Sequence, residues 1–288
     1  METILEIKGL KKSFKDFSLK GIDITIEKGY IMGFVGPNGA GKTTTIKLIM
    51  NLMKKDEGVI KIFGLDNVKH ELDIKQKIGF VYDENNYYEE LTILEMKRVV
   101  APFYKTWDDN AFNKYIGEFR LPLKKKIKDL SKGMKMKFSL TVALSHNAQL
   151  LIMDEPTSGL DPLVRRELLE ILSQIIQDEN KAVFFSTHIT TDLEKIADYI
   201  TLINDGEIVL CSDKDELMNN YGLVRGGKEL LYNLNTKDFI GIKENQFGFE
   251  ALVKDKNQAQ KAYKDKIIIE KPSLEDIMLY YTRRCQNV

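Results

Sequence analysis

The residues whose chemistry is easiest to interpret form a glycine-rich loop. Residues 36–43 are Gly-Pro-Asn-Gly-Ala-Gly-Lys-Thr, which matches G-x-x-x-x-G-K-[ST] at every fixed position. Such glycines let the backbone curl until successive N–H groups point at phosphate oxygens, and the following helix N-terminus adds positive potential. We expect Lys42 to reach the β- and γ-phosphates and the Thr43 hydroxyl to bind Mg²⁺. The loop therefore predicts a site for ATP and Mg²⁺. The residues expected to contact the nucleotide here are Gly36, Pro37, Asn38, Gly39, Ala40, Gly41, Lys42, Thr43 and Thr44.

Two acids stand at the end of an apolar run. Residues 150–153 are Leu-Leu-Ile-Met, and Asp154 and Glu155 follow directly. An apolar strand ending in two acids is usually a strand that reaches solvent. A phosphate loop upstream favours a functional role instead, because ligands bind at the carboxyl ends of the strands in open α/β sheets. We expect Asp154 to hold Mg²⁺, directly or through water, and Glu155 to polarise the attacking water.

A histidine follows a second apolar run. Residues 182–185 are Ala-Val-Phe-Phe, and His188 comes three residues later. A lone histidine at a strand end is more often incidental than catalytic. If this strand lies beside the one that ends in Asp154, however, His188 comes near the γ-phosphate. The residues predicted to act in catalysis are thus Lys42, Glu155 and His188.

The elements that must position these residues follow from the hydrophobic pattern. Alternating apolar and polar residues at 4–8 and 22–26 predict half-buried antiparallel strands. A parallel sheet covered by helices is predicted by continuously apolar runs, which lie at 31–35, 150–153 and 182–185. The phosphate loop follows the first of these runs and precedes a helix-compatible run at 44–53. The sequence therefore predicts an α/β fold, a P-loop NTPase core whose mostly parallel sheet is flanked by helices, with N-terminal antiparallel strands.

Further signals divide the rest of the chain. Asn204-Asp205-Gly206 predicts a hairpin turn between two short β-rich runs. Residues 86–146 contain few strand signals and predict a helical subdomain. Three glycines at 222, 226 and 227 indicate a linker. We therefore expect an ATPase domain over residues 1–220 and a small C-terminal α+β accessory region over residues 221–288.

The accessory region shows structural signals and no chemistry of its own. Ser273 with Asp276 resembles a capping box at the start of a last helix, and Arg283 and Arg284 fall where a helix C-terminus favours cations. Strand-like runs lie at 229–234, 239–242, 249–253 and 266–270.

Composition excludes several classes of protein. Lys+Arg and Asp+Glu both number 43, so the net charge is zero and nonspecific nucleic-acid binding is not expected. The two cysteines, Cys211 and Cys285, form no paired pattern and fit a reducing compartment. No apolar run approaches the roughly 18 residues of a membrane-spanning helix. We expect a cytoplasmic protein whose membrane role, if any, comes through a partner.

Together these residues resemble one family, the ATP-binding subunits of ABC transporters, over about residues 1–220. Residues 36–44 resemble its Walker A motif, Asp154-Glu155 is similar to the end of its Walker B motif, and His188 is similar to its switch histidine. Phe14 lies where the family stacks an aromatic ring on adenine. Two further motifs are similar to the family signature (Leu130-Ser131-Lys132-Gly133-Met134) and to its D-loop (Ser158-Gly159-Leu160-Asp161).

The resemblance implies an assembly as well as a fold. Two copies, or this chain and a different ATPase, would sandwich two ATP molecules. Ser131 and the Gly133 backbone would then serve the partner's γ-phosphate, and Asp161 would line the shared interface. A separately encoded transmembrane permease would be driven by the pair from the inner face of the cell membrane. The ending of the chain is similar to that of bacterial exporters of drugs, bacteriocins and peptides, so the implied cargo is a peptide, antibiotic or other amphipathic compound.

Two motifs depart from the family pattern. The signature has Lys132 in place of a glycine and Met134 in place of a glutamine. We expect Lys132 to face solvent. Asp83 falls where the family has the Q-loop glutamine, so its contact with Mg²⁺ is direct, water-mediated or absent, and Glu84 substitutes if the loop shifts by one residue.

Two other readings compete with a transport motor. One is a soluble ABC-type ATPase acting on nucleic acid or ribosomes, and the other is a degenerate cassette that binds ATP without turnover. The single cassette, the unpaired cysteines and the zero net charge favour the transporter, and the complete set of Lys42, Asp154, Glu155 and His188 favours turnover. Arg165 and Arg166, and the basic run at 124–128, are expected on solvated surfaces.

Overall fold

The computed structural model describes residues 2–82, 87–231 and 238–282. Its central sheet has six strands in the order β10-β9-β3-β8-β7-β6. All neighbours pair in parallel except β10, which forms an antiparallel hairpin with β9. The predicted parallel sheet and hairpin are therefore confirmed. The strands are β3 (Ile31–Val35), β6 (Ile78–Val81), β7 (Leu150–Asp154), β8 (Ala182–Thr187), β9 (Tyr199–Asn204) and β10 (Glu207–Asp213).

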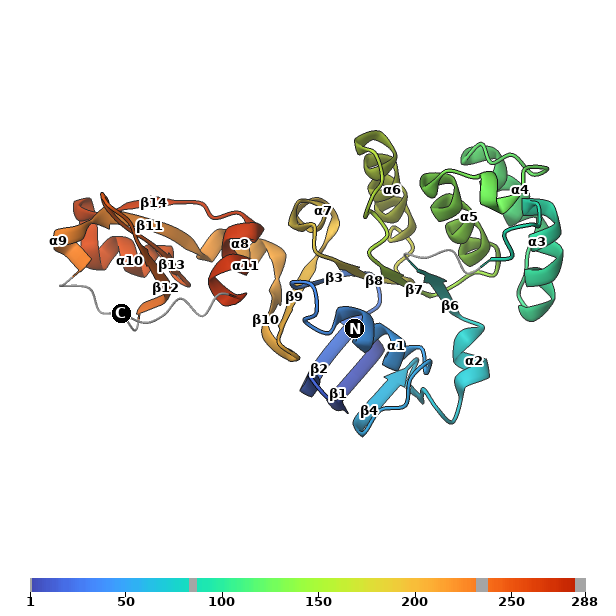
Figure 1. Cartoon of the computed structure of the whole chain (residues 1–288), viewed down its shortest axis with the longest axis horizontal. Helices are drawn as coiled ribbons and strands as arrows, with labels where there is room; N and C mark the ends of the chain where they lie inside the picture. The colour runs from blue at the N-terminus through green and yellow to red at the C-terminus, as the bar shows by residue number, and fades with distance from the viewer. Residues whose placement is uncertain (1, 83–86, 232–237, 283–288) are drawn as a thin grey trace.

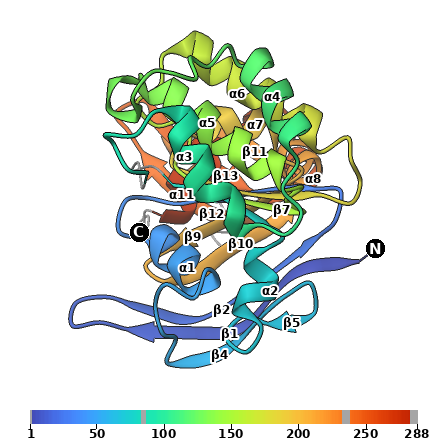
Figure 2. The same cartoon turned by 90° about the vertical axis from the view of Figure 1, so that its right-hand side faces the viewer.

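A second sheet, antiparallel throughout, covers one face of the central sheet. Its order is β2-β1-β4-β5, and buried residues alternate with exposed ones along β2. An apolar core between the two sheets encloses helix α1, and Figure 2 shows this layer on the opposite side from the longer helices. The elements are β1 (Thr3–Ser13), β2 (Ser18–Glu27), α1 (Lys42–Ile49), β4 (Glu57–Ile62), β5 (Leu65–Asp66) and the short α2 (Glu71–Lys75).

Helix α1 differs from the helix-compatible run in both bounds. It begins at Lys42, inside the glycine-rich loop, and ends at Ile49 rather than at residue 53. Asn51 takes a left-handed conformation with φ +53°, and the Leu52 N–H donates to the Lys47 carbonyl at 2.8 Å. This turn satisfies a free carbonyl at the helix end and stops the helix.

The other face of the central sheet carries the longer helices, as expected for residues 87–146. Helix α3 starts with a complete capping box in which Thr92 and Glu95 bond each other's backbone. The largest apolar core joins these helices to β3, β7 and β8. Figure 1 shows α3, α4, α5, α6 and α7 on the side of the sheet away from β1, β2 and β4. The elements are α3 (Ile93–Val100), η1 (Ala101–Phe103), α4 (Asp109–Glu118), η2 (Ile127–Asp129), α5 (Lys132–Ser145), α6 (Pro162–Ile175) and α7 (Thr190–Ile196). Within the described ranges, no helix is both long and apolar enough to span a membrane.

The C-terminal part is an antiparallel sheet, order β12-β13-β11-β14, with short helices. The expected glycine linker is wrong, because Gly222–Gly227 is strand β11. A Cβ on Gly226 would lie 2.6 Å from the Phe249 ring, so this glycine makes room for packing inside the sheet. The strand expected from residue 229 is also wrong in its described part, which is helix α9. The elements are α8 (Lys214–Asn220), β11, α9 (Lys228–Leu231), β12 (Phe239–Glu244), β13 (Gly248–Val253), α10 (Lys256–Tyr263), η4 (Lys264–Lys266), β14 (Ile268–Glu270) and α11 (Leu274–Thr282).

The last helix, α11, begins at the predicted capping box. The Ser273 hydroxyl accepts from the Asp276 N–H at 3.1 Å, and the Ser273 N–H donates to the Asp276 carboxylate at 2.9 Å. The helix packs against α7 and β9, and the Leu274 N–H donates to Glu194 of α7 at 2.7 Å. Arg283 and Arg284 lie outside the described residues.

Candidate active site

The glycine-rich loop links β3 to α1 in a conformation that excludes side chains at two of its glycines. A Cβ on Gly36 would lie 2.2 Å from the Ile203 carbonyl oxygen of β9. Gly41, with φ +116°, occupies a backbone region that L-residues avoid, and a Cβ there would lie 2.9 Å from the Phe17 ring. The fold therefore requires glycine at both positions.

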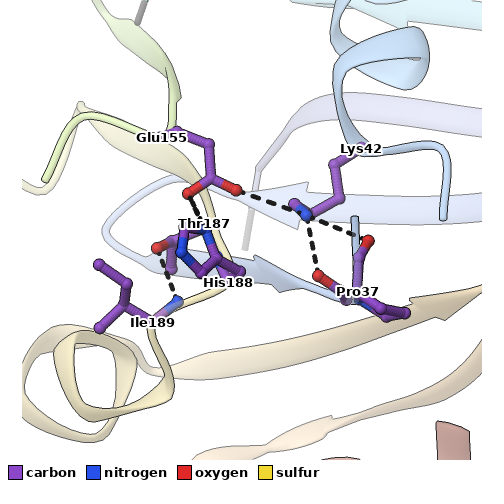
Figure 3. A network of polar contacts seen from close by, with 7 residues as sticks. Pro37, Lys42, Glu155, Thr187, His188 and Ile189 are labelled. Atoms are coloured by element: carbon purple, nitrogen blue, oxygen red, sulfur yellow. Dashed lines mark hydrogen bonds and ion pairs between the residues drawn. The ribbon is translucent and has the colours of Figure 1, made fainter. Parts of the chain in front are cut away.

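Lys42 turns its ammonium group back onto this loop. Its Nζ donates to the Gly36 carbonyl at 2.8 Å and to the Pro37 carbonyl at 3.4 Å, and it lies 3.4 Å from a carboxylate oxygen of Glu155 (Figure 3). The side chain is only 7% exposed. A buried ammonium needs such partners, and phosphate oxygens could replace them at the same position.

Glu155 joins this lysine to His188. Its second carboxylate oxygen lies 2.7 Å from His188 Nδ1 and accepts the His188 backbone N–H at 3.2 Å (Figure 3). The prediction that the two strands lie side by side is confirmed, because β7 and β8 pair in parallel from Leu150 to Asp154. Glu155 itself has φ +49°, a left-handed conformation that is uncommon for a residue with a side chain. Strained backbone of this kind concentrates at functional sites.

Asp154 is a buried carboxylate with one oxygen that lacks a hydrogen-bond partner among the described residues. The residue is 3% exposed, and this oxygen is Oδ1. Burial raises the pKa of the Asp154 carboxyl, while the nearby Thr43 and Ser186 hydroxyls and the charge of Lys42 act in the opposite direction. A divalent cation would supply the missing partner for Oδ1 and favour the ionised form. The Thr43 hydroxyl and the Asp154 carboxylate therefore fit the hard oxygen ligands that Mg²⁺ prefers.

Lys42, Thr43, Glu155 and His188 line one open cavity of about 540 Å³, whereas Asp154 and the loop residues Gly36, Pro37 and Ala40 are not among its lining residues. This volume lies within the usual range for small-molecule sites. Its lining comes from the turn after β1, the loop and start of α1, the end of β7 and the end of β8. The lining residues are Phe17, Asn38, Gly39, Gly41, Lys42, Thr43, Thr44, Glu155, Ser158 and His188.

Comparisons with known proteins show the family of this chain. A profile for the ABC transporter family matches residues 19–158. The chain is 33% identical over 212 residues to the bacitracin transport ATP-binding protein BcrA of Bacillus licheniformis, which covers 73% of this chain and 69% of that protein. The chain belongs to the ABC transporter ATP-binding proteins.

Two further relatives extend the likeness. The lantibiotic transport ATP-binding protein SrtF of Streptococcus pyogenes is 34% identical over 227 residues, covering 75% of this chain and 96% of that one. A solved structure, described as the ATP-binding subunit of an ABC transporter, has a TM-score of 0.68 and 29% identity, and it covers 75% of this chain and 92% of the other. The P-loop NTPase fold is thereby confirmed.

The aromatic residue at the cavity of this ABC protein differs from the one chosen on the sequence. Phe17 lines the cavity, whereas Phe14 does not. Phe14 is 44% exposed and its ring lies 6.3 Å from that of Phe17, centroid to centroid. The stacking of Phe14 on adenine stays a prediction. The Phe14 N–H donates to the Phe17 carbonyl at 2.8 Å and closes the turn that carries both rings. On the sequence, the signal for Phe17 is that a second aromatic residue stands three positions after Phe14.

Three residues of the signature and D-loop motifs, Ser131, Gly133 and Asp161, do not line this cavity. Ser131 caps the start of α5, and Asp161 caps the start of α6 by accepting two backbone N–H groups at 3.1 Å. Gly133 is buried where the two helices meet, and a Cβ on it would lie 2.6 Å from Val164. Their roles toward a nucleotide stay predictions.

Three other sequence expectations have mixed outcomes. Asp83 and Glu84 lie outside the described residues, so the Q-loop assignment stays a prediction. Ser158, quoted only as part of the D-loop, lines the cavity. Arg165 was expected on a solvated face, but its Nε donates to the fully buried Asp192 at 2.6 Å, and that expectation is wrong. Arg166, 77% exposed and paired with Glu170, fits it.

Proposed function

We propose that this ATP-binding subunit hydrolyses ATP in a Mg²⁺-dependent reaction and uses it to drive a separate permease. The observation that carries the proposal is the meeting of Lys42, Glu155 and His188 at one cavity. A structural ion pair alone would not need a phosphate loop, two strand ends and, next to them, a buried carboxylate with one oxygen that has no hydrogen-bond partner in the described part of the chain.

The chain's own groups have separate tasks in this reaction. Water attacks the γ-phosphorus, the bond to the bridging oxygen breaks, and ADP and phosphate leave. Lys42 exchanges its carbonyl partners for phosphate oxygens and offsets their charge. Glu155 orients the water and accepts its proton, and His188 holds the Glu155 carboxylate in place. Mg²⁺, held by Thr43 and Asp154, would supply further neutralisation of the phosphates.

A second copy, or a different ATPase, completes the site in our proposal. Ser131 and Asp161 are exposed at helix starts outside the cavity, where they are available to nucleotide held by another chain, and Gly133 lies two residues after Ser131 in the first turn of α5. This placement and the family resemblance support a nucleotide-sandwich dimer. Residues 1–220 would form the ATPase domain and residues 221–288 an accessory region.

The permease would dock on the helical side. An aromatic cavity of about 330 Å³ lies between β6 and the helices, walled by Phe80, Tyr87, Phe103 and Tyr104. Phe103 is 71% exposed, and large exposed aromatic residues are typical of partner contacts. A chain held there would be cytoplasmic and peripheral to the membrane. The relatives' names, which refer to bacitracin and lantibiotic transport, support export of peptide antibiotics or similar amphipathic compounds.

The test is Mg²⁺-ATPase activity of the chain co-expressed with its permease. We expect activity that needs the permease and disappears in Glu155→Gln, while the matched change Glu170→Gln on the exposed face of α6 leaves it intact. With saturating ATP, Glu155→Gln is expected to elute as a dimer in gel filtration. Equal activity without any membrane protein, together with co-purification of ribosomes or DNA, would instead favour the soluble ATPase.

A further inference from the structure

Helix α7 follows the switch histidine, and an ion pair between the partly exposed Arg165 and the buried Asp192 holds it to α6. Arg165 donates through Nε to Asp192 Oδ1 at 2.6 Å and through a terminal nitrogen to the Thr191 hydroxyl at 2.9 Å. Asp192 is fully buried, and the other oxygen of its carboxylate has no hydrogen-bond partner among the described residues. Arg165 is therefore the charged partner on which this buried carboxylate depends.

The position of the pair along the chain gives it a functional meaning. Arg165 lies one helical turn after Asp161, and its N–H donates to the Asp161 carbonyl at 2.9 Å. Asp192 lies four residues after His188, at the beginning of α7. The pair thus joins two helices just beyond the D-loop aspartate and the switch histidine. Figures 1 and 2 both show α6 and α7 next to each other, and their residues are in contact.

The rigidity of this link follows from its geometry. Two donors of one planar guanidinium engage two consecutive residues of α7, which fixes both the distance and the rotation of that helix. By contrast, His188 is 45% exposed, and the bonds from its ring and backbone N–H to Glu155 are the contacts that direct it toward the site. A small shift of α7 would therefore move the ring relative to Glu155.

We propose that Arg165 and Asp192 are positioning residues that set the orientation of His188 according to the position of α6. The proposal rests on the proposed ATP hydrolysis and identifies a coupling within it. A displacement of Asp161 at an interface between two chains would reach His188 through this pair. Neither residue touches the nucleotide cavity, so their effect is exerted on the rate and not on nucleotide binding.

The experiment removes the link without leaving a buried charge alone. Arg165→Met combined with Asp192→Asn discards both charges, whereas either change alone strands its partner. We expect the purified complex with its permease to unfold at the wild-type temperature, to keep KM for ATP within about 2-fold, and to lose about 10- to 100-fold in kcat, the scale of a misplaced catalytic group. The matched control Arg166→Met with Glu170→Gln removes a neighbouring exposed pair and should leave kcat unchanged.

A double-mutant cycle separates positioning from a general structural role. In a His188→Ala background the pair variant should cause no further loss, because the group it orients is gone. Additive losses, or an unchanged kcat in the pair variant, would overturn the inference and leave the ATPase standing. If the His188→Ala complex hydrolyses ATP as fast as the wild type does, the role of the histidine and this inference are both overturned. Absence of hydrolysis in the wild type would refute the proposed function itself.

Discussion

His146 makes the stability of this protein depend on pH in a way that can be isolated. The ring lies at the C-terminal end of α5, is 1% exposed, and stacks on Tyr104 with 3.8 Å between ring centroids and 7° between planes. Neither ring nitrogen has a hydrogen-bond partner among the described residues. Burial lowers the pKa of His146 to about 4, with the Gln76 backbone favouring the charged form to a smaller degree.

The sign and size of the effect follow from this lowered pKa. An unfolded chain carries a histidine with pKa about 6.5. Between pH 6.5 and 4 the unfolded state therefore binds a proton that the folded state does not, so the free energy of unfolding falls as the pH falls. From pH 7 to pH 5 this single group removes about 2 kcal/mol of stability.

The perturbation is His146→Phe, which keeps a flat ring against Tyr104 and removes the titrating group. Urea unfolding at pH 7 and pH 5 should show that the wild type loses about 2 kcal/mol more than the variant. His70→Gln, a change at an exposed histidine, serves as control and should behave as the wild type does. A variant whose pH dependence matches the wild type within about 0.5 kcal/mol would refute the reasoning, since every other titrating group is common to both.

Three further substitutions test separate parts of the structure. Phe17→Ala should weaken binding of a fluorescent ATP analogue by about 5- to 150-fold if its ring stacks on the base, and an equal or larger loss in Phe14→Ala would return that role to Phe14. Ser273→Ala removes the cap of α11 and should lower the free energy of unfolding in urea by about 1 kcal/mol, so an unchanged midpoint would show that α11 is held by packing alone. Gly133→Ala forces a methyl group against Val164 and should cost about 1–3 kcal/mol of stability in the same assay, whereas a neutral result would mean that α5 and α6 separate freely.

The nucleotide cavity was the part most open to prediction from the sequence. Local sequence patterns predict the backbone segments that carry its residues. These segments are a glycine-rich loop after one buried strand and two acids at the end of another. The loop after β3 is found where the pattern placed it, although α1 already begins at Lys42, and the strand before Glu155 is found at Leu150–Asp154. The expected adjacency of the two strands is confirmed by the parallel pairing of β7 with β8, which brings His188 to Glu155 at the strand ends where ligands bind in such sheets.

The C-terminal glycines show where local pattern misleads. Three glycines within six residues suggest a flexible connection, yet strand β11 pairs along its whole length with β13. Gly248 stands opposite Gly227, and a Cβ on Gly248 would lie 2.1 Å from the Gly226 carbonyl oxygen. The need for glycine at these positions comes from a neighbouring strand about 20 residues away, and composition alone does not reveal that strand.

Arg165 and Arg166 show both what local sequence pattern predicts and what it does not. On the sequence the adjacent arginines look alike, but their helical phases differ: Arg165 precedes the buried Leu168, Leu169 and Leu172 by three, four and seven residues, so it shares their apolar stripe. A charged residue on such a stripe must find a buried counter-charge, and Asp192 supplies it from α7, the helix that follows strand β8 in the chain. The helical phase of Arg165 can be predicted from the sequence. Its partner Asp192 cannot, because the contact between α6 and α7 depends on the order of the strands in the sheet. Residues that touch a nucleotide are thus found by motif, and residues that hold two helices together are found by asking which charges the fold has buried.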